Sequence, residues 1–265
     1  MWIDDVTGIL REAAEVAILP RFRALVDGQV TEKAPGEVVT VADQEAEALI
    51  SPRLRRIVDA PVVGEEATAA DPGLLAALRE APAAWVVDPL DGTANFVAGR
   101  PEYAVMAALV RGGETIAGWI LRPADGGVYI AEKGGGAWRD GVRLRREPAP
   151  ADPAHLRGAV LTRFLDPPAL ARVEAVAPRF TDLGPGAICS GVDYPRLVDG
   201  EQDFVLFQRT LPWDHAPGAL LLTEAGGVAR RPDGSAYRPA DTGPGGLLIA
   251  ADEACWHTAR TLLDP

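Results

Sequence analysis

"WVVDPLDGTANF", Trp85 to Phe96, ends an apolar run with two carboxylates. The apolar residues are typical of a buried strand, and Asp88 stands where that strand must reach the surface. Pro89 fixes its own φ and keeps Asp88 extended, and a turn after it would let Asp88 and Asp91 point the same way. Two carboxylates this close repel each other unless a cation lies between them or one is protonated. The stretch therefore predicts a cation site at the end of a strand.

The ligand types in this stretch favour magnesium. Carboxylate oxygens suit Mg²⁺ better than zinc, and no His or Cys stands nearby in the sequence. The backbone carbonyl of Leu90 would add a third oxygen. Gly92 and Thr93 can begin a helix, whose free N–H groups and adjacent hydroxyl suit a phosphate. The alternative is a turn without a metal, because Asp, Pro and Gly are common turn residues.

Acidic residues follow apolar runs in three other places. "VVGEEA" ends a second strand-like run with Glu65 and Glu66, "VVTVADQEAE" holds Asp43, and "PWDHAPGALLLTEAGG" puts Asp214 at the start of an apolar helix. Each has a structural alternative: a solvated acidic turn for the two glutamates, and a helix cap for the two aspartates. These alternatives do not explain why the acids cluster where apolar strands emerge. Sites in layered folds are commonly built at strand ends and helix starts.

Length and composition bound the class of protein. The 265 residues fit one large domain or two packed halves, and an apolar fraction of 48% supports a sizeable core. The net charge of −12 disfavours nonspecific binding to nucleic acid or to an anionic membrane. The negative net charge still allows a small anionic substrate, provided that bound metal ions make the electrostatic potential at the site positive. We expect no membrane span and no signal peptide. Cys189 and Cys255 show no metal spacing, so a reduced, cytoplasmic setting is expected.

The hydrophobic pattern alternates between helix and strand periods, which predicts a layered α/β fold with a mixed sheet in each half. A proline-dense stretch between Pro148 and Pro168 marks the connection between halves of about 1–147 and 148–265. Apolar runs punctuated by Gly-Gly and Asp-Gly predict an antiparallel meander over 103–144. We predict helices over about 3–23, 42–57, 167–177, 215–227 and 252–263, and further strands within 60–66, 83–88, 158–164, 203–207 and 246–251.

The motifs together resemble a known family. "DPLDGTANF", with "GEE" upstream and "WDHAPG…EAGG" downstream, is similar to the inositol monophosphatase family, in the Mg-dependent, lithium-sensitive phosphatase superfamily. The resemblance runs from "TVAD" near residue 40 to the final helix. It implies a single domain over residues 1–265 with an αβαβα sandwich like that of inositol monophosphatase and fructose-1,6-bisphosphatase. It also implies a metal-dependent phosphoric monoester hydrolase, often a homodimer, that hydrolyses a small phosphorylated metabolite, inositol 1-phosphate first, by metal-activated water.

The resemblance also implies the metal ligands. Glu65, Asp88 and the carbonyl of Leu90 would hold one Mg²⁺. Asp88, Asp91 and Asp214 would hold a second. Glu65 would reach a weaker third ion through water.

The remaining roles follow from the same resemblance. Asp43 and Thr93 would position the attacking water, so that with Glu65 they form the catalytic set. Substrate binding would fall to Asp91 and to the N–H groups of Gly92 and Thr93.

The sequence departs from the family pattern in the residues just before the "WD" motif. Inositol-selective members carry an acid a few residues before "WD", but no acid lies between Asp203 and Asp214 here. Gln208 and Arg209 occupy that stretch. Arg209 would contact a second anionic group on the substrate, or it would pair with a carboxylate at the surface. Pro217 replaces an alanine of the family motif, and we expect it in the tolerant first turn of a helix.

Three other residues have weaker expectations. Ser190 is expected near the substrate, because the corresponding stretch lines the pocket in relatives. Lys33 lies on an expected loop, where it would screen the phosphate or remain solvated. His215 is expected to point away along its helix to the surface.

Two kinds of alternative function stay open. The first changes only the substrate, to fructose 1,6-bisphosphate, 3'-phosphoadenosine 5'-phosphate or histidinol phosphate. The second is a binding role: a regulatory partner of the transcription apparatus, or a sugar or nucleotide binder without catalysis. The presence of Asp43 and Thr93 beside the acids favours an enzyme over a pure binder.

Overall fold

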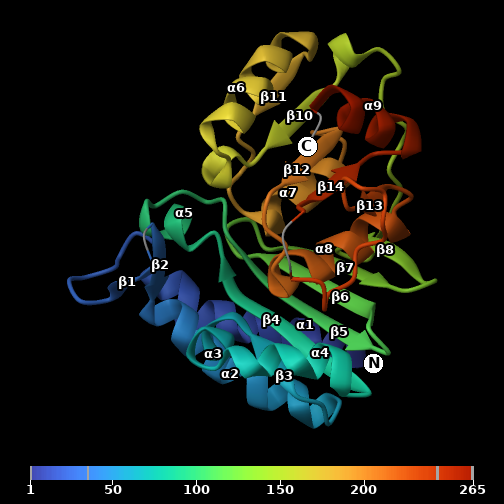
Figure 1. Cartoon of the computed structure of the whole chain (residues 1–265). Helices are drawn as coiled ribbons and strands as arrows, with labels where there is room; N and C mark the ends of the chain where they lie inside the picture. Colours follow the sequence, from blue (N-terminus) through green and yellow to red (C-terminus); the bar gives the residue numbers. More distant parts are fainter. Residues whose placement is uncertain (1, 35, 243–244, 264–265) are drawn as a thin grey trace.

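The computed structural model describes residues 2–34, 36–242 and 245–263. Two large β-sheets, of seven and five strands in the described residues, alternate with three layers of helices, as Figure 1 shows. Helices α1 and α2 cover the outer face of the first sheet, α7 and α8 pack between the sheets, and α6 and α9 cover the second sheet. The arrangement is the expected αβαβα sandwich. No helix in the described part of the chain is long and apolar enough to cross a membrane.

The first sheet has seven strands in sequential order and carries Asp88 and Asp91 on its second strand. Its first two strands are parallel and the others are antiparallel, so the predicted meander is confirmed. Because β3 and β4 are parallel, their carboxyl ends meet at one edge of the sheet. The strands are β3 (Val62–Gly64), β4 (Ala83–Asp91), β5 (Ala104–Arg111), β6 (Glu114–Arg122), β7 (Gly127–Glu132), β8 (Gly136–Arg139) and β9 (Val142–Leu144).

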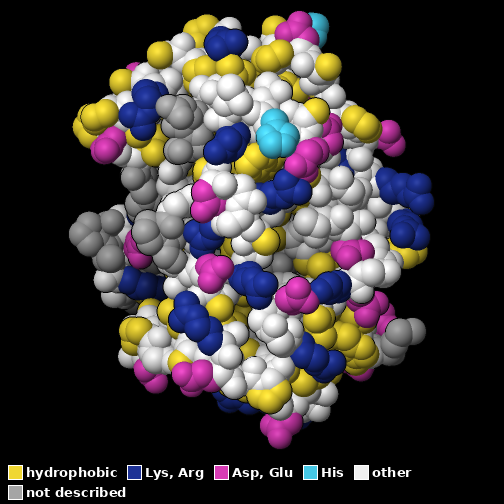
Figure 2. Space-filling model, turned by 45° about the vertical axis from the view of Figure 1, so that its right-hand side comes forward, with side chains coloured by type: hydrophobic (Ala, Val, Ile, Leu, Met, Phe, Trp, Pro, Cys, Tyr) yellow, Lys and Arg dark blue, Asp and Glu magenta, His cyan; other side chains and the backbone are white. Residues whose placement is uncertain are grey.

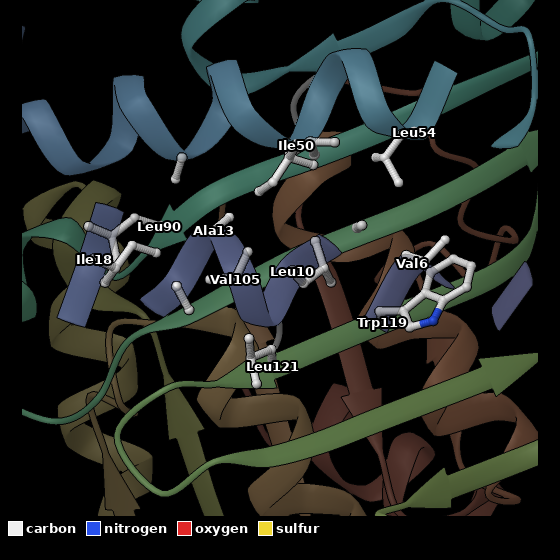
Figure 3. Close-up of a cluster of buried hydrophobic side chains, with 14 of the residues drawn as sticks. Val6, Leu10, Ala13, Ile18, Ile50, Leu54, Leu90, Val105, Trp119 and Leu121 are labelled. Atoms are coloured by element: carbon white, nitrogen blue, oxygen red, sulfur yellow. The ribbon is translucent and has the colours of Figure 1, made fainter. Parts of the chain in front are cut away.

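The outer helices bury one apolar face against this sheet. In α1 (Trp2–Ala13) the residues Val6 and Leu10 recur at helical spacing and are fully buried. They meet Ile50 and Leu54 of α2 (Val41–Ile57) above the sheet, as Figure 3 shows. The first predicted helix continues beyond α1 through a π-helical turn (Ala14–Ile18) and a 3₁₀ turn (Leu19–Arg21) that contains the expected proline.

The second sheet is mixed, with strand order β11-β10-β12-β14-β13. The predicted strand over 158–164 ends early and gives way to a 3₁₀ turn at Thr162–Phe164. The sheet strands are β10 (Arg157–Val160), β11 (Asp182–Gly184), β12 (Phe204–Phe207), β13 (Val228–Arg230) and β14 (Leu247–Ala250). The helices around them are α6 (Pro167–Val176), α7 (Ser190–Val198), α8 (Pro212–Glu224) and α9 (Glu253–Leu263).

Helix α8 lies unusually close to its neighbours. A side chain on Gly118 of β6 would fall 2.8 Å from Pro217 Cα, and one on Gly218 would fall 2.1 Å from the Tyr194 ring. Pro217 therefore lies inside the helix, not in its first turn as expected, and it packs on the sheet. This close packing holds α8 against β6 and against Tyr194 of α7 (Ser190–Val198).

Shorter elements complete the edge of the first sheet. They are the hairpin β1 (Val30–Ala34) and β2 (Glu37–Thr40), and the helices α3 (Glu65–Ala70), α4 (Ala77–Glu80) and α5 (Thr93–Val97). The face of the molecule drawn in Figure 2 mixes basic and acidic side chains. No uniformly basic surface of the kind that binds nucleic acid is seen on that face.

Candidate active site

A β-bulge brings Asp88 and Asp91 to one side of β4. The strand does not end at Asp88, as the sequence predicted, but continues to Asp91. Asp88 pairs with Met106 and Asp91 with Ala104, so two residues, Pro89 and Leu90, stand opposite a single residue of β5. Residues three apart on a regular strand face opposite sides, and the extra residue of a bulge reverses that alternation. The bulge replaces the turn that we expected.

Asp214 completes the cluster from the other half of the chain. Carboxylate oxygens of Asp88, Asp91 and Asp214 all lie within 4.8 Å of one another. The cap of α8 is Leu211, and Asp214 makes no capping hydrogen bond. The helix-cap alternative for Asp214 is therefore wrong, because the helix begins two residues earlier and the Asp214 carboxylate lies beside those of Asp88 and Asp91.

Helix α7 holds Asp91 from the opposite side. The Asp91 Oδ2 atom accepts hydrogen bonds from Ser190 Oγ at 2.8 Å and from the Gly191 N–H at 2.6 Å. The Cys189 thiol lies 3.3 Å from the same oxygen. Ser190 thus lines the cavity with its hydroxyl directed at Asp91. The sequence pattern did not predict a helix here, because Gly191 and an internal proline conceal the helical pattern.

Asp43 and Thr93 meet at the start of two helices. The cap of α2 is Thr40, so Asp43 is the third helical residue and not the expected cap. Its Oδ2 atom accepts from the Thr40 N–H at 2.8 Å and the Thr40 hydroxyl at 2.6 Å, which forms a capping box. Its Oδ1 atom accepts from Thr93 Oγ1 at 2.8 Å. That hydroxyl also lies 2.9 Å from the Leu90 carbonyl, so the bulge and both helix starts meet at Thr93.

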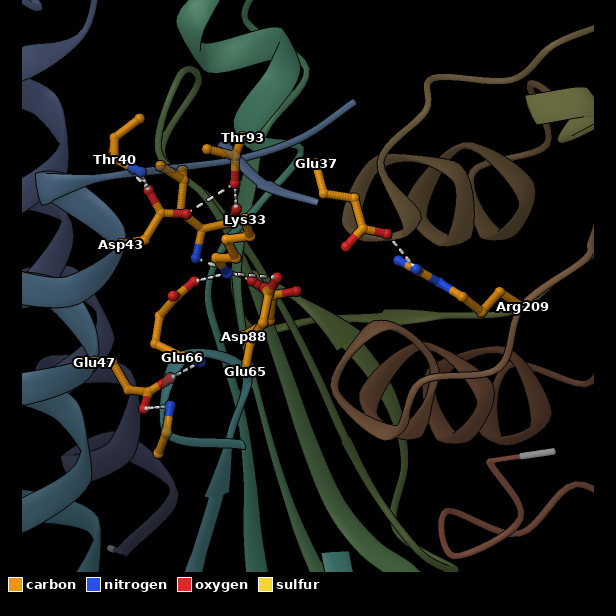
Figure 4. Close-up of polar contacts among 12 residues, drawn as sticks. Lys33, Glu37, Thr40, Asp43, Glu47, Glu65, Glu66, Asp88, Thr93 and Arg209 are labelled. Carbon is orange, nitrogen blue, oxygen red and sulfur yellow. Dashed lines mark hydrogen bonds and ion pairs between the residues drawn. The ribbon is translucent and has the colours of Figure 1, made fainter. Parts of the chain in front are cut away.

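Glu65 and Glu66 begin α3 and are not a solvated turn. Lys33 of β1 pairs with both of them, at 3.3 Å from Glu65 Oε1, and it is not the solvated loop lysine of one expectation. Glu47 of α2, which sequence reasoning missed, accepts hydrogen bonds from the N–H groups of Glu66 and Ala67 at 2.8 and 2.9 Å. Figure 4 shows how these contacts fix the start of α3. The signal was available, because Asp43 and Glu47 stand four residues apart on one helix face.

The acids of this site hold protons more tightly than free carboxyls do. Burial, followed by repulsion from neighbouring carboxylates, raises the pKa of Asp88 and of Asp214 well above the ordinary value. Burial also raises the pKa of Glu65 to about 7 and that of Asp43 to about 6. The pKa of Asp91 is raised by burial, against the hydrogen bonds that it accepts. A site of buried oxygen donors that resist losing protons fits a hard divalent cation, which would offset their mutual repulsion.

A cavity of about 340 Å³ lies beside these acids. Arg209 and Lys33 line it from opposite halves of the chain. Arg209 pairs with Glu37 of the β1–β2 hairpin, which is the carboxylate pairing expected as the alternative to a substrate contact; Figure 4 shows the pair. Gly92 and Thr93, whose N–H groups are expected to hold phosphate, line the same cavity.

His215 is buried, and the expectation of a surface residue is wrong. Its Nε2 atom lies 2.9 Å from the Arg209 carbonyl, and its Nδ1 atom lies 3.2 Å from the Tyr194 hydroxyl. Burial lowers the pKa of His215 to about 4, so the ring stays neutral at physiological pH. The helix begins earlier than predicted, which turns this residue inward beside the cavity.

The sequence matches the Inositol monophosphatase family over residues 2–263. The chain belongs to this family. It is 33% identical over 241 residues to the inositol-1-monophosphatase of Mesorhizobium japonicum, which covers 85% of this chain and 82% of that protein. It is 31% identical over 188 residues to the Nus factor SuhB of Xylella fastidiosa, covering 68% and 66% of the two chains.

Solved structures share the fold. The extragenic suppressor protein suhB from Bartonella henselae matches with a TM-score of 0.85 and 22% identity, covering 99% of this chain and 98% of that chain. An IMPase/NADP phosphatase complexed with Mg²⁺ and phosphate matches with a TM-score of 0.80 and 19% identity, covering 97% and 92%. With family membership, the chain is a phosphoric monoester hydrolase of the inositol monophosphatase type.

Proposed function

We propose that this phosphatase depends on Mg²⁺ and releases phosphate from a small phosphorylated metabolite, with inositol 1-phosphate as the first candidate. The observation that carries the proposal is the buried cluster of Asp88, Asp91 and Asp214 beside the Asp43–Thr93 pair. Glu65, Asp88 and the Leu90 carbonyl would hold one ion. Asp88, Asp91 and Asp214 would hold the other. Bound Mg²⁺ supplies positive charge to the phosphate and lowers the pKa of water.

The protein's own groups would orient the reactants. Thr93 and Asp43 lie in hydrogen-bond contact, so together they can hold a water molecule and accept its proton. The N–H groups of Gly92 and Thr93 stand at the start of α5, where they can donate to phosphate oxygens. Water would then form a bond to phosphorus and give one proton to Asp43 as the bond between phosphorus and the ester oxygen breaks, and the departing oxygen would take up a proton to leave as the alcohol.

Direct attack by water is favoured over a covalent route. Cys189 is the thiol nearest the cluster among the described residues, and burial with the Asp91 charge raises its pKa well above the ordinary value. A protonated thiol is a poor nucleophile. Because the Cys189 thiol hydrogen-bonds the Asp91 carboxylate, we propose that it helps to position Asp91 in the acidic cluster.

Phosphate release by the purified protein tests the proposal. With Mg²⁺ we expect turnover of at least one of inositol 1-phosphate, fructose 1,6-bisphosphate, 3'-phosphoadenosine 5'-phosphate, histidinol phosphate and glycerol 2-phosphate, and with EDTA we expect none. Asp88→Asn should lower kcat by about 10³-fold or more. This loss is larger than that expected for one preorganised electrostatic group, because Asp88 is proposed to bind both ions.

The folded state of Asp88→Asn is checked by its melting temperature, which should not fall, because the change relieves the repulsion among the buried carboxylates. Asp59→Asn, at an exposed position in the sequence between α2 and β3, is the matched control and should keep wild-type activity. Full activity of Asp88→Asn, or equal activity in Mg²⁺ and EDTA, would contradict the metal assignment.

A binding role is the second candidate, favoured by the similarity to a Nus factor SuhB. If the protein is a regulatory partner of the transcription apparatus, a pull-down from a native extract should recover RNA polymerase components. The Asp88→Asn variant should recover them as well as the wild type does. A purely metabolic enzyme would recover none of them. We also propose a cytoplasmic homodimer, from the family resemblance; light scattering of the eluted protein measures the assembly.

A further inference from the structure

A carboxylate and a guanidinium from the two halves of the chain meet at the cavity. Glu37 of β2 and Arg209 form this ion pair, and both side chains line the cavity and are partly exposed. Figure 4 shows the two side chains pointing toward each other. Among the described residues that line the cavity, Glu37 is the only carboxylate outside the acids of the proposed metal site. We call Glu37 and Arg209 the charged pair.

Hydrogen bonds to the backbone hold each member of the charged pair in place. The Arg209 carbonyl lies 2.9 Å from His215 Nε2, and because a carbonyl can only accept, this nitrogen donates to it. On the other side, Arg163 Nη2 donates to the carbonyl of Gly36, the residue before Glu37, at 2.6 Å. The β1–β2 hairpin is thereby tied to the second half of the chain, and the charged pair joins two anchored segments.

The same segments place the charged pair beside the proposed metal site. His215 follows Asp214 directly in α8. The hairpin that carries Glu37 also carries Lys33, whose Nζ atom lies 3.3 Å from Glu65 Oε1. In the proposed function the acids and the start of α5 take the phosphate. The charged pair is therefore left to contact the group to which the phosphate is esterified.

The chemistry of the charged pair suits neighbouring hydroxyl groups. An ionised carboxylate only accepts hydrogen bonds and a guanidinium only donates them. One hydroxyl of a polyol can donate to Glu37 while its neighbour accepts from Arg209, and hydrogen bonds to charged groups are stronger than those between neutral ones. A second phosphate fits less well, because Glu37 repels it and offsets the Arg209 charge. An apolar group would take water from both charges without replacing its hydrogen bonds.

The size of the cavity agrees with a polyol of one ring. Its volume of about 340 Å³ is near the lower end of the range of about 300–1,000 Å³ for small-molecule sites. We infer that Glu37 and Arg209 are specificity-determining residues, which bind neighbouring hydroxyl groups of a polyol leaving group. The sequence has no acid between Asp203 and Asp214, so the hairpin supplies the carboxylate. The inference rests on the proposed phosphatase function and names the residues that would recognise a polyol phosphate in the same site.

Two esters of matched shape test the inference. Inositol 1-phosphate and cyclohexyl phosphate each release a secondary alcohol of a six-membered ring, but only the first ring carries further hydroxyl groups. Damage to the metal site lowers kcat/KM for both esters and cancels in their ratio. We expect the wild-type ratio to favour inositol 1-phosphate by at least about tenfold. Glu37→Ala and Arg209→Ala should each lower the ratio about tenfold, the loss of one hydrogen bond to a charged group.

Glu253→Ala is the matched control. Glu253 forms an ion pair of similar exposure with Arg230, outside the cavity lining. Its ratio should equal that of the wild type, and all three variants should fold, because exposed ion pairs contribute little to stability. A wild-type ratio near one, or an unchanged ratio in Glu37→Ala, overturns the inference and leaves the phosphatase function standing.

Fructose 1,6-bisphosphate separates hydroxyl recognition from anion recognition. If the charged pair were a site for a second phosphate, Glu37→Ala would raise kcat/KM for this ester, because Arg209 would lose its counter-charge. Arg209→Ala would lower the same value. These opposite effects, together with an unchanged ratio for the two ring esters, would overturn the inference in favour of an anion site.

A lack of phosphate release from every ester would count against the proposed function instead. Inositol 1-phosphate itself then serves as the ligand in calorimetry with Mg²⁺. Binding to the wild type that is about tenfold tighter than binding to Glu37→Ala supports the charged pair as a hydroxyl site. Equal binding to both proteins, or binding to neither, overturns it.

Discussion

The Thr93 hydroxyl lies 2.8 Å from the Asp43 carboxylate and 2.9 Å from the Leu90 carbonyl. A hydroxyl carries one proton, so it can donate to only one of these acceptors at a time. Burial raises the pKa of Asp43 to about 6. Asp43 can therefore carry a proton in weakly acidic solution, and at a pH above its pKa it can accept one. The pair is thus arranged to exchange a proton with a third group beside it, and water is the group that hydrolysis requires.

Replacing Thr93 with Val tests this role at the residue scale. Thr93→Val keeps the shape but removes the hydroxyl, and we expect kcat to fall by about 10²–10³-fold with KM within about threefold. Thr93→Ser is the matched control and should retain most of the activity. Steady-state kinetics at saturating Mg²⁺ measure both values. A rise in KM with unchanged kcat would assign Thr93 to substrate binding.

Two helices are coupled through Glu47 at the scale of elements. Its carboxylate, on α2, accepts the first free N–H groups of α3, and α3 carries Glu65. A side chain on Gly64 would fall 2.4 Å from the Glu47 carboxylate carbon, so only glycine leaves room for this contact. The backbone of Gly64 is extended and has a negative φ, so alanine there adds bulk without backbone strain.

Gly64→Ala and Glu47→Gln should therefore have the same effect. Each displaces or weakens the cap of α3, and we expect the Mg²⁺ concentration for half-maximal activity to rise about tenfold, as for other groups that support metal ligands. The free energy of unfolding should fall by about 1–2 kcal/mol. Gly8→Ala, in α1 with open space around it, is the control: it should leave the metal dependence unchanged and raise the free energy of unfolding by up to about 1 kcal/mol, because alanine is the better helix former. A lower kcat at saturating Mg²⁺ with unchanged metal dependence would contradict the positioning role.

The elements divide into those that a sequence pattern can predict and those that it cannot. The meander and α2 were predicted, because hydrophobic periodicity and Gly-Gly turns are local signals. The bulge at Pro89 was not, because pairing register depends on the neighbouring strand. Helix α7 was missed for a similar reason: Gly191 is required by close packing on Ala104, 2.5 Å from where its side chain would lie, although glycine is a poor helix former.

The site as a whole is shared between the two halves of the molecule. Asp88 and Asp91 come from the first sheet, whereas Asp214 and Ser190 come from helices that pack between the sheets. Motif order along the chain could predict which acids belong together, through the family resemblance. It could not predict that Ile188 and Phe207 would share one cavity with them. Contacts among residues distant in sequence decide that, and no local pattern records them.

The buried acids also set how the stability of the whole protein depends on pH. The pKa of Glu65 is raised to about 7 in the folded state, and those of Asp88 and Asp214 are also raised well above the values of an unfolded chain. Between about pH 4 and 7 the folded protein therefore binds more protons than the unfolded chain, so metal-free stability is greatest at the acidic end and falls as pH rises. Mg²⁺ binds the ionised acids, so its stabilising effect should grow over the same range.

Thermal unfolding at about pH 5, 6, 7 and 8, in EDTA and in excess Mg²⁺, measures this linkage. The melting temperature in EDTA should decline towards the alkaline end, and the gap between the two curves should widen by roughly 5 °C, since about 1 kcal/mol corresponds to 2–4 °C for a chain of this size. Asp214→Asn removes one of the coupled acids and should flatten the decline in EDTA. A gap that stays constant or narrows would mean that the acids are already ionised without metal, and the cluster would then need another source of positive charge; Lys33, which pairs with Glu65, would be such a source.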